Sequence, residues 1–406
     1  MARPYPIITV NEKAARSLRA GHPWVYGAET TGPDVPYENG DIVDVVTQKG
    51  RWLGAGLIND NSKIRVRLIS RNTNDRFDEA FWRRRLQHAL EYRRTVMGPD
   101  FSTSRLIFGE ADFFPGLTVD LFGDILVTEV LSLGMEKVKH ILYPNLVDLL
   151  AGYGVKVRAL YERNEAALRV KEGIPQEKGF YDLPGLATDL DGHVIITENN
   201  IKYDVDYING QKTGFFLDQK YNRRAAAALA PGMRVLDCFT HTGAFAMNCA
   251  MAGAEQVTAV DISKDAVELT RRNAQLNGLT NMDAIQADVF DLLTDMAKEK
   301  KSPYDYIILD PPAFTKSGAT VKNAFRGYKE INLKAMKLLP RGGYLATCSC
   351  SHFMTPNLFC QMLREAAADA AVSLRQIEDR RQSPDHPILW GVPETEYLKF
   401  YLFQVV

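Results

Sequence analysis

The second half of the chain alternates between short apolar runs and longer segments with helical periodicity. After residue 223, the runs RVLDCF, QVTAVDI, YDYIILD and GGYLATCSCS each predict a buried strand. Between them, segments such as KDAVELTRRNAQLNG and FRGYKEINLKAMKLL repeat apolar residues at the spacing of a helix. Repeated strand–helix units predict an α/β fold, a doubly wound, mostly parallel sheet covered on both faces. The closing YLKFYLFQVV predicts one further, antiparallel strand.

The first half of the chain shows two other patterns. Residues 1–73 alternate short apolar and polar stretches between glycines, with little helical periodicity, which predicts a small β-barrel. Residues 74–190 begin with a helix at 78–96 and then read as strand, turn, strand and helix. This part predicts a linker helix and a small central α+β domain. A hairpin, HVIITENNIKYDVDYINGQ, is then predicted to lead into the last domain, residues 191–406.

The composition is that of an ordinary globular protein, with 46% apolar and 24% charged residues among 406. The sequence has no run of roughly 18 apolar residues, and its start does not look like a signal peptide, so we expect a cytoplasmic protein without a membrane span. Its five cysteines are scattered and show neither CxxC spacing nor a histidine-containing ligand set. This pattern argues against disulfides and against a structural metal.

The net charge of −1 is unevenly distributed. Residues 1–98 hold 16 Lys/Arg against 11 Asp/Glu, a net charge of +5, so the rest of the chain carries −6. In RFDEAFWRRRLQHALEYRRTV the basic residues alternate with aromatic ones, a mixture that suits a phosphate backbone and unstacked bases. The solvated face of a helix explains the same segment equally well.

Acidic residues end four successive predicted strands of the last domain. They are Asp237, Asp261, Asp288 and Asp310, and the segment TCSCS ends the strand after them. In a doubly wound sheet, ligands bind beyond the carboxyl ends of the strands. Any one of these acids alone is unremarkable as a helix N-cap, but four in succession indicate a ligand site.

The first strand-end loop, DCFTHTGAF, contains a single glycine, Gly243. A loop that cradles pyrophosphate needs several glycines, so a nicotinamide dehydrogenase is disfavoured. Asp261 follows Asp237 by 24 residues, about where an acid that binds a ribose is expected. This order of features resembles the class I methyltransferases that use S-adenosylmethionine. The resemblance implies that Asp237 and its loop hold the methionine part, Asp261 the ribose hydroxyls, and Asp288 with Val289 the adenine.

The motif DPPAF, from Asp310 to Phe314, ends the fourth strand beside the expected methyl donor. It resembles the (Asp/Asn)-Pro-Pro-aromatic motif of methyltransferases that act on planar nitrogens. In that motif, the acid and a proline carbonyl accept from an amino group while the aromatic ring stacks on the substrate. A proline-stiffened turn is the plain structural alternative.

Two cysteines end the fifth strand and suggest a different target. Side chains two residues apart share a face of a strand, so Cys348 and Cys350 are predicted to point the same way, with Cys350 nearer the carboxyl end. Carbon 5 of a pyrimidine becomes nucleophilic once a thiolate has added to carbon 6, and an acid near ring nitrogen 3 assists that addition. Cys350 and Asp310 are the candidates for these two roles. A buried cysteine is often only a small apolar residue, and we favour this interpretation for Cys348.

Taken together, the motifs resemble the bacterial large-subunit ribosomal RNA methyltransferase I family, which methylates C5 of cytosine in 23S ribosomal RNA. GHPWVYG and GRWLGAGLIND are similar to its RNA-binding PUA domain, and KTGFFLDQ, FTHTGAF, LDPPAF, SCS, DHP and YLK to its catalytic domain. The resemblance implies S-adenosylmethionine as cofactor, 23S ribosomal RNA or a large-subunit precursor as partner, and Cys350 as nucleophile. It leaves a homodimer open. His352 and His241 depart from the family pattern, and His386 is a candidate for removing the carbon 5 proton.

The residues expected to bind the cofactor are Asp218, Gln219, Asp237, Phe239, Thr242, Gly243, Asp261, Ile262, Asp288, Val289 and Asp310. Two other functions stay open. One is methylation of a base nitrogen of adenine or guanine through DPPAF, with the cysteines structural. The other is a non-catalytic RNA-binding or ribosome-assembly protein that has kept the fold.

Overall fold

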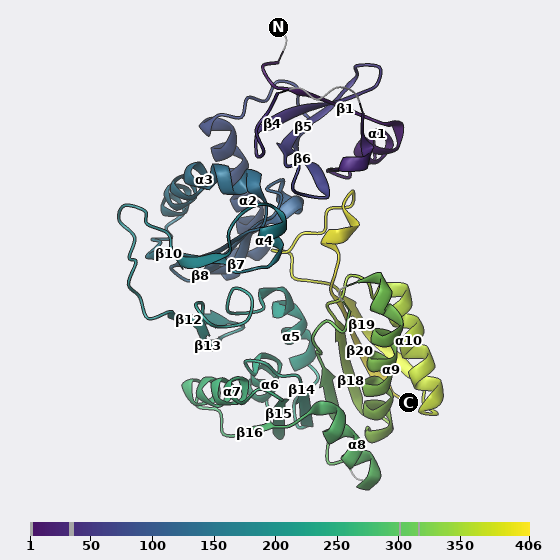
Figure 1. Cartoon of the computed structure of the whole chain (residues 1–406). Coiled ribbons are helices and arrows are strands. Elements are labelled where there is room, and N and C mark those ends of the chain that lie inside the picture. The colour runs from purple at the N-terminus through teal and green to yellow at the C-terminus, as the bar shows by residue number, and fades with distance from the viewer. Residues whose placement is uncertain (1–2, 32–35, 300–301, 316) are drawn as a thin grey trace. The chain divides into compact units, whose positions relative to one another are not determined.

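The computed structural model of the chain describes residues 3–31, 36–299, 302–315 and 317–406 (Figure 1). The chain folds into two compact units, each assembled from separate stretches of sequence. The first comprises Met1–Val194, Val205–Leu217 and Pro384–Thr395, and the second comprises Ile195–Asp204, Asp218–Ser383 and Glu396–Val406. Within the described ranges, no helix combines the length and the apolar character needed to cross a membrane.

The first unit begins with a sheet of six described strands in the order β2-β6-β5-β4-β1-β3. The strands are β1 (Ile7–Val10), β2 (Trp24–Tyr26), β3 (Thr30–Thr31), β4 (Ile42–Thr47), β5 (Trp52–Ile58) and β6 (Ile64–Ser70). The predicted short strands are present, but the sequence pattern missed helix α1 (Glu12–Arg19). Asn11 caps this helix by accepting from the Ala14 amide at 3.0 Å. Leu18 is the helix's one large apolar residue, which is why its periodicity is hard to see.

The rest of the first unit is built on helix α2 (Glu79–Met97), close to the predicted 78–96, and on a second sheet. Its five described strands lie in the order β11-β10-β9-β8-β7. The bounds are β7 (Thr103–Phe108), β8 (Leu117–Phe122), β9 (Ile125–Val130), α3 (Leu133–Gly152), β10 (Ala159–Asn164), α4 (Leu168–Lys171) and β11 (Glu177–Phe180). One apolar core joins α2 and α3 to this sheet, which confirms the predicted α+β character.

The second unit contains a sheet of seven described strands in the order β16-β15-β14-β17-β18-β20-β19. The first five of these are parallel, and β20 is antiparallel to both of its neighbours, as the sequence predicts. The strands are β14 (Arg234–Cys238), β15 (Gln256–Asp261), β16 (Met282–Gln286), β17 (Tyr306–Leu309), β18 (Tyr344–Ser349), β19 (Leu374–Arg380) and β20 (Lys399–Val405). The sequence pattern missed β19, because this edge strand is largely exposed and carries few apolar residues. The predicted hairpin is present as β12 (His193–Glu198) and β13 (Ile201–Asp206).

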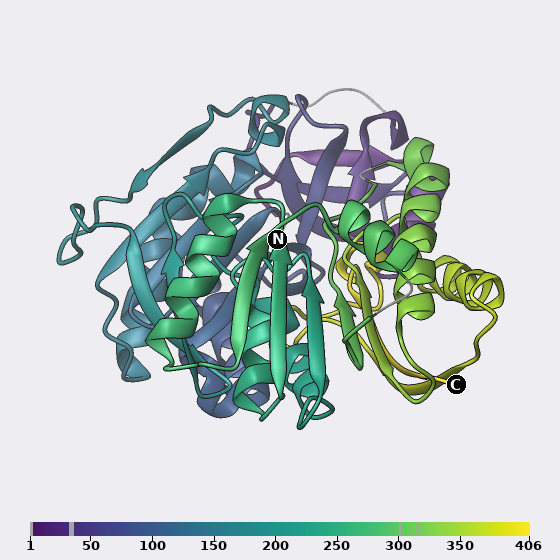
Figure 2. The same ribbon diagram turned by 90° about the horizontal axis from the view of Figure 1, so that it is seen from below.

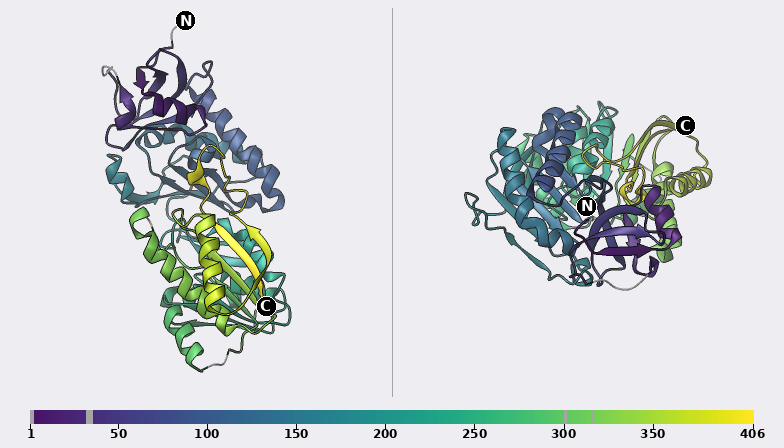
Figure 3. Two further views of the ribbon diagram at one scale, coloured as in Figure 1. Left: turned by 90° about the vertical axis from the view of Figure 1, so that its right-hand side faces the viewer. Right: turned by 90° about the horizontal axis from the view of Figure 1, so that it is seen from above.

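Helices cover both faces of this sheet. They are α5 (Lys220–Ala227), α6 (Ala244–Met251), α7 (Lys264–Leu276), α8 (Val289–Glu299), α9 (Val321–Leu338) and α10 (Pro356–Asp369). Side chains alternate along β14, so that Leu236 and Cys238 join a core with α8, α9 and α10, whereas Val235 joins a core with α5, α6 and α7. Figure 2 shows the parallel strands side by side, and Figure 3 shows α9 next to α10. The predicted doubly wound fold is thereby confirmed.

Candidate active site

The acids at the strand ends gather at the carboxyl edge of the parallel strands. Asp237 lies one residue before the end of β14, Asp261 ends β15, and Asp310 follows β17. Strand β14 lies between the other two strands. The carboxylates of Asp310 and Asp261 both act to raise the pKa of Asp237, so the three groups lie within electrostatic reach of one another. Topology therefore brings together acids that are far apart in the sequence.

Asp237 is fully buried, and its carboxylate is only partly satisfied. Its Oδ2 atom accepts from the Thr240 hydroxyl at 2.5 Å and from the Ala246 amide at 3.0 Å. Its Oδ1 atom has no hydrogen-bond partner among the described residues. Burial, together with the charge of Asp310, raises the pKa of Asp237 to about 7. A carboxylate in this state is suited to a ligand that brings a positively charged donor.

The loop after β14 holds two non-glycine residues, Phe239 and His241, in the left-handed region, with φ of 63° and 53°. Such conformations are uncommon for residues with a side chain, and they mark a backbone shaped by its surroundings. The His241 amide donates to Asp261 Oδ2 at 2.9 Å, which ties the loop to the next strand. Burial lowers the pKa of the His241 imidazole to about 4, so this ring is neutral at physiological pH.

The same loop passes close to helix α7. A Cβ atom at Gly243 would lie 2.6 Å from Cγ2 of Thr270, and the φ of Gly243 is 80°. Thr242 is buried, and its carbonyl accepts from Nδ2 of Asn273 on α7 at 3.3 Å. Close approach and backbone conformation together require glycine at position 243.

The other acids partly serve as backbone caps. The carboxylate of Asp261 accepts from the Ser263 amide at 2.9 Å as well as from His241, and Oδ1 of Asp288 accepts from the first amides of α8. Asp261 and Asp288 therefore both cap backbone amides, which is the structural role expected for an acid at a strand-to-helix turn. Beside them, Ile262 is 64% exposed whereas Val289 is buried, so Ile262 offers free apolar surface at this edge.

Asp310 belongs to a polar network. Gln219 donates through Nε2 to both carboxylate oxygens at 3.1 Å and accepts from Asn222 Nδ2 at 2.7 Å. Cys348 lies in the apolar core beside α5, α6 and α7, as the sequence favoured, and its thiol also donates to Asp310. Burial, followed by the charge of Asp218, raises the pKa of Asp310 to about 7.

Asp218 enters the site from the short helix Leu217–Gln219. Its Oδ2 atom accepts from the Tyr397 hydroxyl at 2.6 Å, and its backbone carbonyl accepts from the Ser383 amide at 2.7 Å. Its Oδ1 atom is buried without a hydrogen-bond partner in the described part of the chain. Asp218 and Asp237 thus each have one carboxylate oxygen that can accept a hydrogen bond from a ligand.

The two cysteines occupy different environments. Cys348 lies inside β18 and is fully buried, whereas Cys350 follows the strand directly and is half-buried. The next residue, Ser351, donates its hydroxyl to the Thr315 carbonyl at 2.8 Å, which holds the segment after β18 in place. His352 is exposed, and its ring packs edge-on against Phe353. Of the two thiols, Cys350 is the one placed at the carboxyl edge of the sheet.

Sequence reasoning missed three charged or polar residues near this edge. Arg223 on α5 forms a buried, two-point ion pair with Glu198 of the hairpin, with N–O distances of 2.6 and 2.8 Å. Lys399, at the start of β20, is 1% exposed. Tyr397 reaches Asp218 as described above. Tyr397 and Lys399 belong to the YLK motif, which pointed to the catalytic domain, but charged residues are normally exposed and the motif gives no signal for burial or for these contacts.

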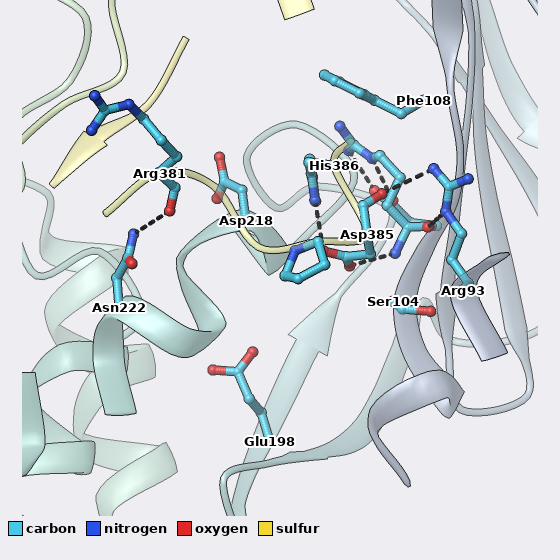
Figure 4. Close-up of polar contacts among 12 residues, drawn as sticks. Arg93, Ser104, Phe108, Glu198, Asp218, Asn222, Arg381, Asp385 and His386 are labelled. Carbon is cyan, nitrogen blue, oxygen red and sulfur yellow. Dashed lines mark hydrogen bonds and ion pairs between the residues drawn. The ribbon is translucent and has the colours of Figure 1, made fainter. Parts of the chain in front are cut away.

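His386 lies in the first unit, on the segment Pro384–Thr395. Its Nδ1 atom is 3.0 Å from Oδ1 of Asp385, and its ring packs beside Phe108 (Figure 4). The Asp385 carbonyl in turn accepts from Arg93 at 3.0 Å. His386 is 3% exposed, and its role as the base that removes the carbon 5 proton stays a prediction.

Comparison with known proteins agrees with this architecture. Residues 186–404 match the family described as S-adenosylmethionine-dependent methyltransferase, and residues 8–71 match the PUA-like domain. Two curated relatives named Ribosomal RNA large subunit methyltransferase I are similar over nearly their whole length. The protein from Klebsiella pneumoniae strain 342 is 36% identical over 405 residues, covering 99% of both chains. The one from Shewanella denitrificans is 40% identical over 391 residues, covering 95% of both.

Solved structures show the same fold. A protein of Streptococcus mutans described as a SAM-dependent methyltransferase superimposes with a TM-score of 0.80 at 21% identity, covering 98% of this chain and 100% of the other. A methyltransferase complexed with S-adenosylhomocysteine gives a TM-score of 0.82, also at 21% identity and with the same coverage. The fold and the matched families define an S-adenosylmethionine-dependent methyltransferase with a PUA-like domain. The full-length relatives then show that this chain belongs to the ribosomal RNA large subunit methyltransferase I family, and they confirm the resemblance drawn from its motifs.

The edge of the sheet fits the cofactor of this family. S-adenosylmethionine carries an ammonium group, ribose hydroxyls and an adenine amino group, all of which donate hydrogen bonds. The open oxygens of Asp218 and Asp237 are buried acceptors without a donor in the described residues, and an unsatisfied buried acceptor is costly. A ligand rich in donors satisfies this requirement.

Proposed function

We propose that this chain methylates C5 of a cytosine in 23S ribosomal RNA through a covalent adduct on Cys350. The name of the curated relatives supports ribosomal RNA of the large subunit as the substrate. The observation that carries the choice of carbon 5 is the position of Cys350, half-buried just beyond β18 and at the same sheet edge as Asp310. No thiol is needed for methylation of a nitrogen, whereas carbon 5 requires one.

In the proposed reaction, the Cys350 thiolate attacks carbon 6, a bond forms between Sγ and carbon 6, and the ring electrons shift toward carbon 5 and nitrogen 3. Asp310, with its pKa raised to about 7, can hold a proton at neutral pH and offer it to nitrogen 3. S-adenosylmethionine, when bound, supplies the electrophilic methyl group that carbon 5 takes up. Loss of the carbon 5 proton to a base then expels the Cys350 thiolate, and nitrogen 3 returns its proton to Asp310 as the aromatic ring is restored.

The remaining predicted residues receive cofactor-binding roles. We assign Asp237, with the loop of Phe239, Thr242 and Gly243, to the methionine part of the cofactor. Asp261 and Ile262 are assigned to the ribose, and Asp288 and Val289 to the adenine. Asp218 and Gln219 line the donor site beside Asp310. The partial backbone capping by Asp261 and Asp288 leaves each carboxylate with acceptor capacity for these contacts.

Function is proposed to divide along the chain. Residues 1–73 bind RNA, and residues 191–406 carry out the chemistry. Residues 74–190 connect these two domains. The substrate is naked 23S RNA or a large-subunit precursor. The PUA-like match at residues 8–71 and the net charge of +5 over residues 1–98 support RNA binding at the front of the chain.

Methylation of a base nitrogen is the second candidate, because DPPAF resembles the motif of such enzymes. There the aromatic residue must be available to stack on the base. Here the Phe314 ring packs against Tyr328, with ring centroids 4.5 Å apart, and lies 5.9 Å from the ring of Phe290. These internal contacts favour a structural role for Phe314 and hence the carbon 5 reaction.

The test is methylation of unmodified 23S RNA with isotopically labelled S-adenosylmethionine, followed by nucleoside mapping. We expect 5-methylcytosine from the native enzyme and from Cys360→Ala, and none from Cys350→Ala. Cys360 is a suitable control because it lies on α10 and is also half-buried. A methylated adenine or guanine would establish the second candidate instead. Absence of both methylation and S-adenosylhomocysteine binding would support a non-catalytic RNA-binding protein.

A further inference from the structure

A buried lysine flanks the segment that carries Cys350. Lys399 begins β20 and pairs with Ser349 in the antiparallel ladder between β18 and β20. Its Nζ atom donates to the Ser351 carbonyl and to the Tyr397 carbonyl, each at 2.6 Å. The strand pairing and the bond to Ser351 thus place Lys399 against the residues on both sides of Cys350. The residue is 1% exposed, so its ammonium group is buried.

Burial of an ammonium group is energetically unfavourable unless its surroundings compensate for it, because removing the charge from water is costly. Two carbonyl acceptors compensate only part of that cost, and no carboxylate forms an ion pair with Lys399 in the described part of the chain. Burial lowers the pKa of Lys399 to about 8, and the group that opposes this shift most strongly is Cys350. An ionised Cys350 would therefore be the strongest negative charge acting on this lysine.

Other charged and titratable groups lie around the pair. Arg381 and Glu396 both affect Lys399, but they pair with each other at 2.8 Å. Tyr328, from α9, lies near Cys350, and its hydroxyl accepts from Ser349 Oγ at 3.0 Å. On the other side, the fully buried Cys348 donates to Asp310. Among these groups, Lys399 is the buried cation that is bound to the segment carrying Cys350.

We propose that Lys399 is a positioning residue that holds Cys350 as a thiolate and fixes the segment on which it lies. The inference rests on the proposed function, in which that thiolate attacks carbon 6. The Cys350 thiol loses its proton to solvent, and the negative charge left on Sγ is paired with the ammonium group. When Sγ bonds to carbon 6 the negative charge moves into the ring, where the proton from Asp310 neutralises it, and a negative charge returns to Sγ when the adduct breaks down. Lys399 keeps its proton throughout.

The test measures alkylation of Cys350 by iodoacetamide as a function of pH, read by mass spectrometry of the peptides. Only the thiolate reacts, so the rate follows ionisation. Lys399→Gln removes the charge and keeps a donor for the carbonyls, and Lys399→Met is the second neutral variant if glutamine disturbs folding. Lys399→Arg keeps the charge. Cys360 in the same protein is the internal reference, since the remaining cysteines are fully buried.

We expect the neutral variants to shift the alkylation midpoint of Cys350 upward by about one pH unit, so that the rate near neutral pH falls about tenfold. The midpoint of Cys360 should not move, and Lys399→Arg should retain most of the native profile. Binding of S-adenosylhomocysteine verifies that each variant is folded. An unchanged Cys350 profile in a folded neutral variant overturns the proposal, even if methylation falls.

This outcome is distinguishable from failure of the proposed function, because alkylation needs neither RNA nor methyl transfer. If Cys350→Ala still methylated RNA, the covalent reaction would be wrong. A shifted alkylation profile in Lys399→Gln would nevertheless show that the lysine controls the thiol. Conversely, an inactive Cys350→Ala enzyme with an unshifted profile in Lys399→Gln would refute the role of the lysine alone.

Discussion

The raised pKa of Asp237 predicts that cofactor affinity depends on pH. With a pKa of about 7, this carboxyl is mostly protonated at about pH 6 and mostly ionised at about pH 8. Only the ionised form attracts the ammonium group of the ligand, so affinity should rise as pH increases through the pKa. The ionised fraction changes from about one tenth to about nine tenths, which corresponds to a roughly tenfold gain in affinity, or about 1.4 kcal/mol.

Isothermal titration with S-adenosylhomocysteine at these two pH values measures the effect. This ligand is preferred because its amino group lacks a neighbouring sulfonium charge and stays protonated across the range. Asp237→Asn should bind more weakly near pH 8 and lose the pH dependence. Asp283→Asn is the control, because this acid lies on β16 with a side chain that is 66% exposed. Equal affinity of the native enzyme at both pH values would refute the reasoning about Asp237.

Three further predictions concern stability and RNA binding. Arg223→Met leaves Glu198 buried without its partner, so it should lower the free energy of unfolding by roughly 3–5 kcal/mol in urea denaturation. The double variant Arg223→Met/Glu198→Leu should recover part of this loss, because it also removes the unpaired charge. Gly243→Ala places a Cβ atom against Thr270 in a left-handed backbone conformation, so it should lower the free energy of unfolding by about 1–3 kcal/mol in thermal denaturation. Gly318→Ala is the control and should be nearly neutral, because the added Cβ meets no atom within 4 Å. The basic front of the chain predicts that RNA affinity falls more than tenfold between about 50 and about 200 mM salt, and an affinity independent of salt would contradict RNA binding through phosphates.

The sequence predicts the fold well where the apolar pattern is strong. The parallel strands β14, β15, β17 and β18 are mostly apolar runs, so their existence and their place in a mostly parallel sheet could be anticipated. Strand β19 was not predicted because its edge position leaves most of its side chains in water. Helix α1 was not predicted because it contains a single large apolar residue. Weak periodicity, and not irregular structure, accounts for both omissions.

The candidate site was predictable to the extent that it lies at strand ends. Asp237, Asp261 and Asp310 could be grouped because parallel strands bring their carboxyl ends to one edge. The partners of these acids could not be predicted. Lys399 is distant in sequence from Cys350, and only the pairing of β20 with β18 brings it there. Similarly, nothing in the sequence indicates that Gln219 donates to Asp310.

The most direct test of the central claim is trapping of the covalent intermediate. A 23S RNA fragment that contains 5-fluorocytosine cannot lose the substituent at carbon 5 as a proton, so the adduct with the enzyme should persist. Incubation with S-adenosylmethionine is predicted to give a complex that resists denaturation and carries the RNA on the Cys350 peptide, and Cys350→Ala should give none. Attachment to another residue, or an active enzyme that forms no adduct, would contradict the account.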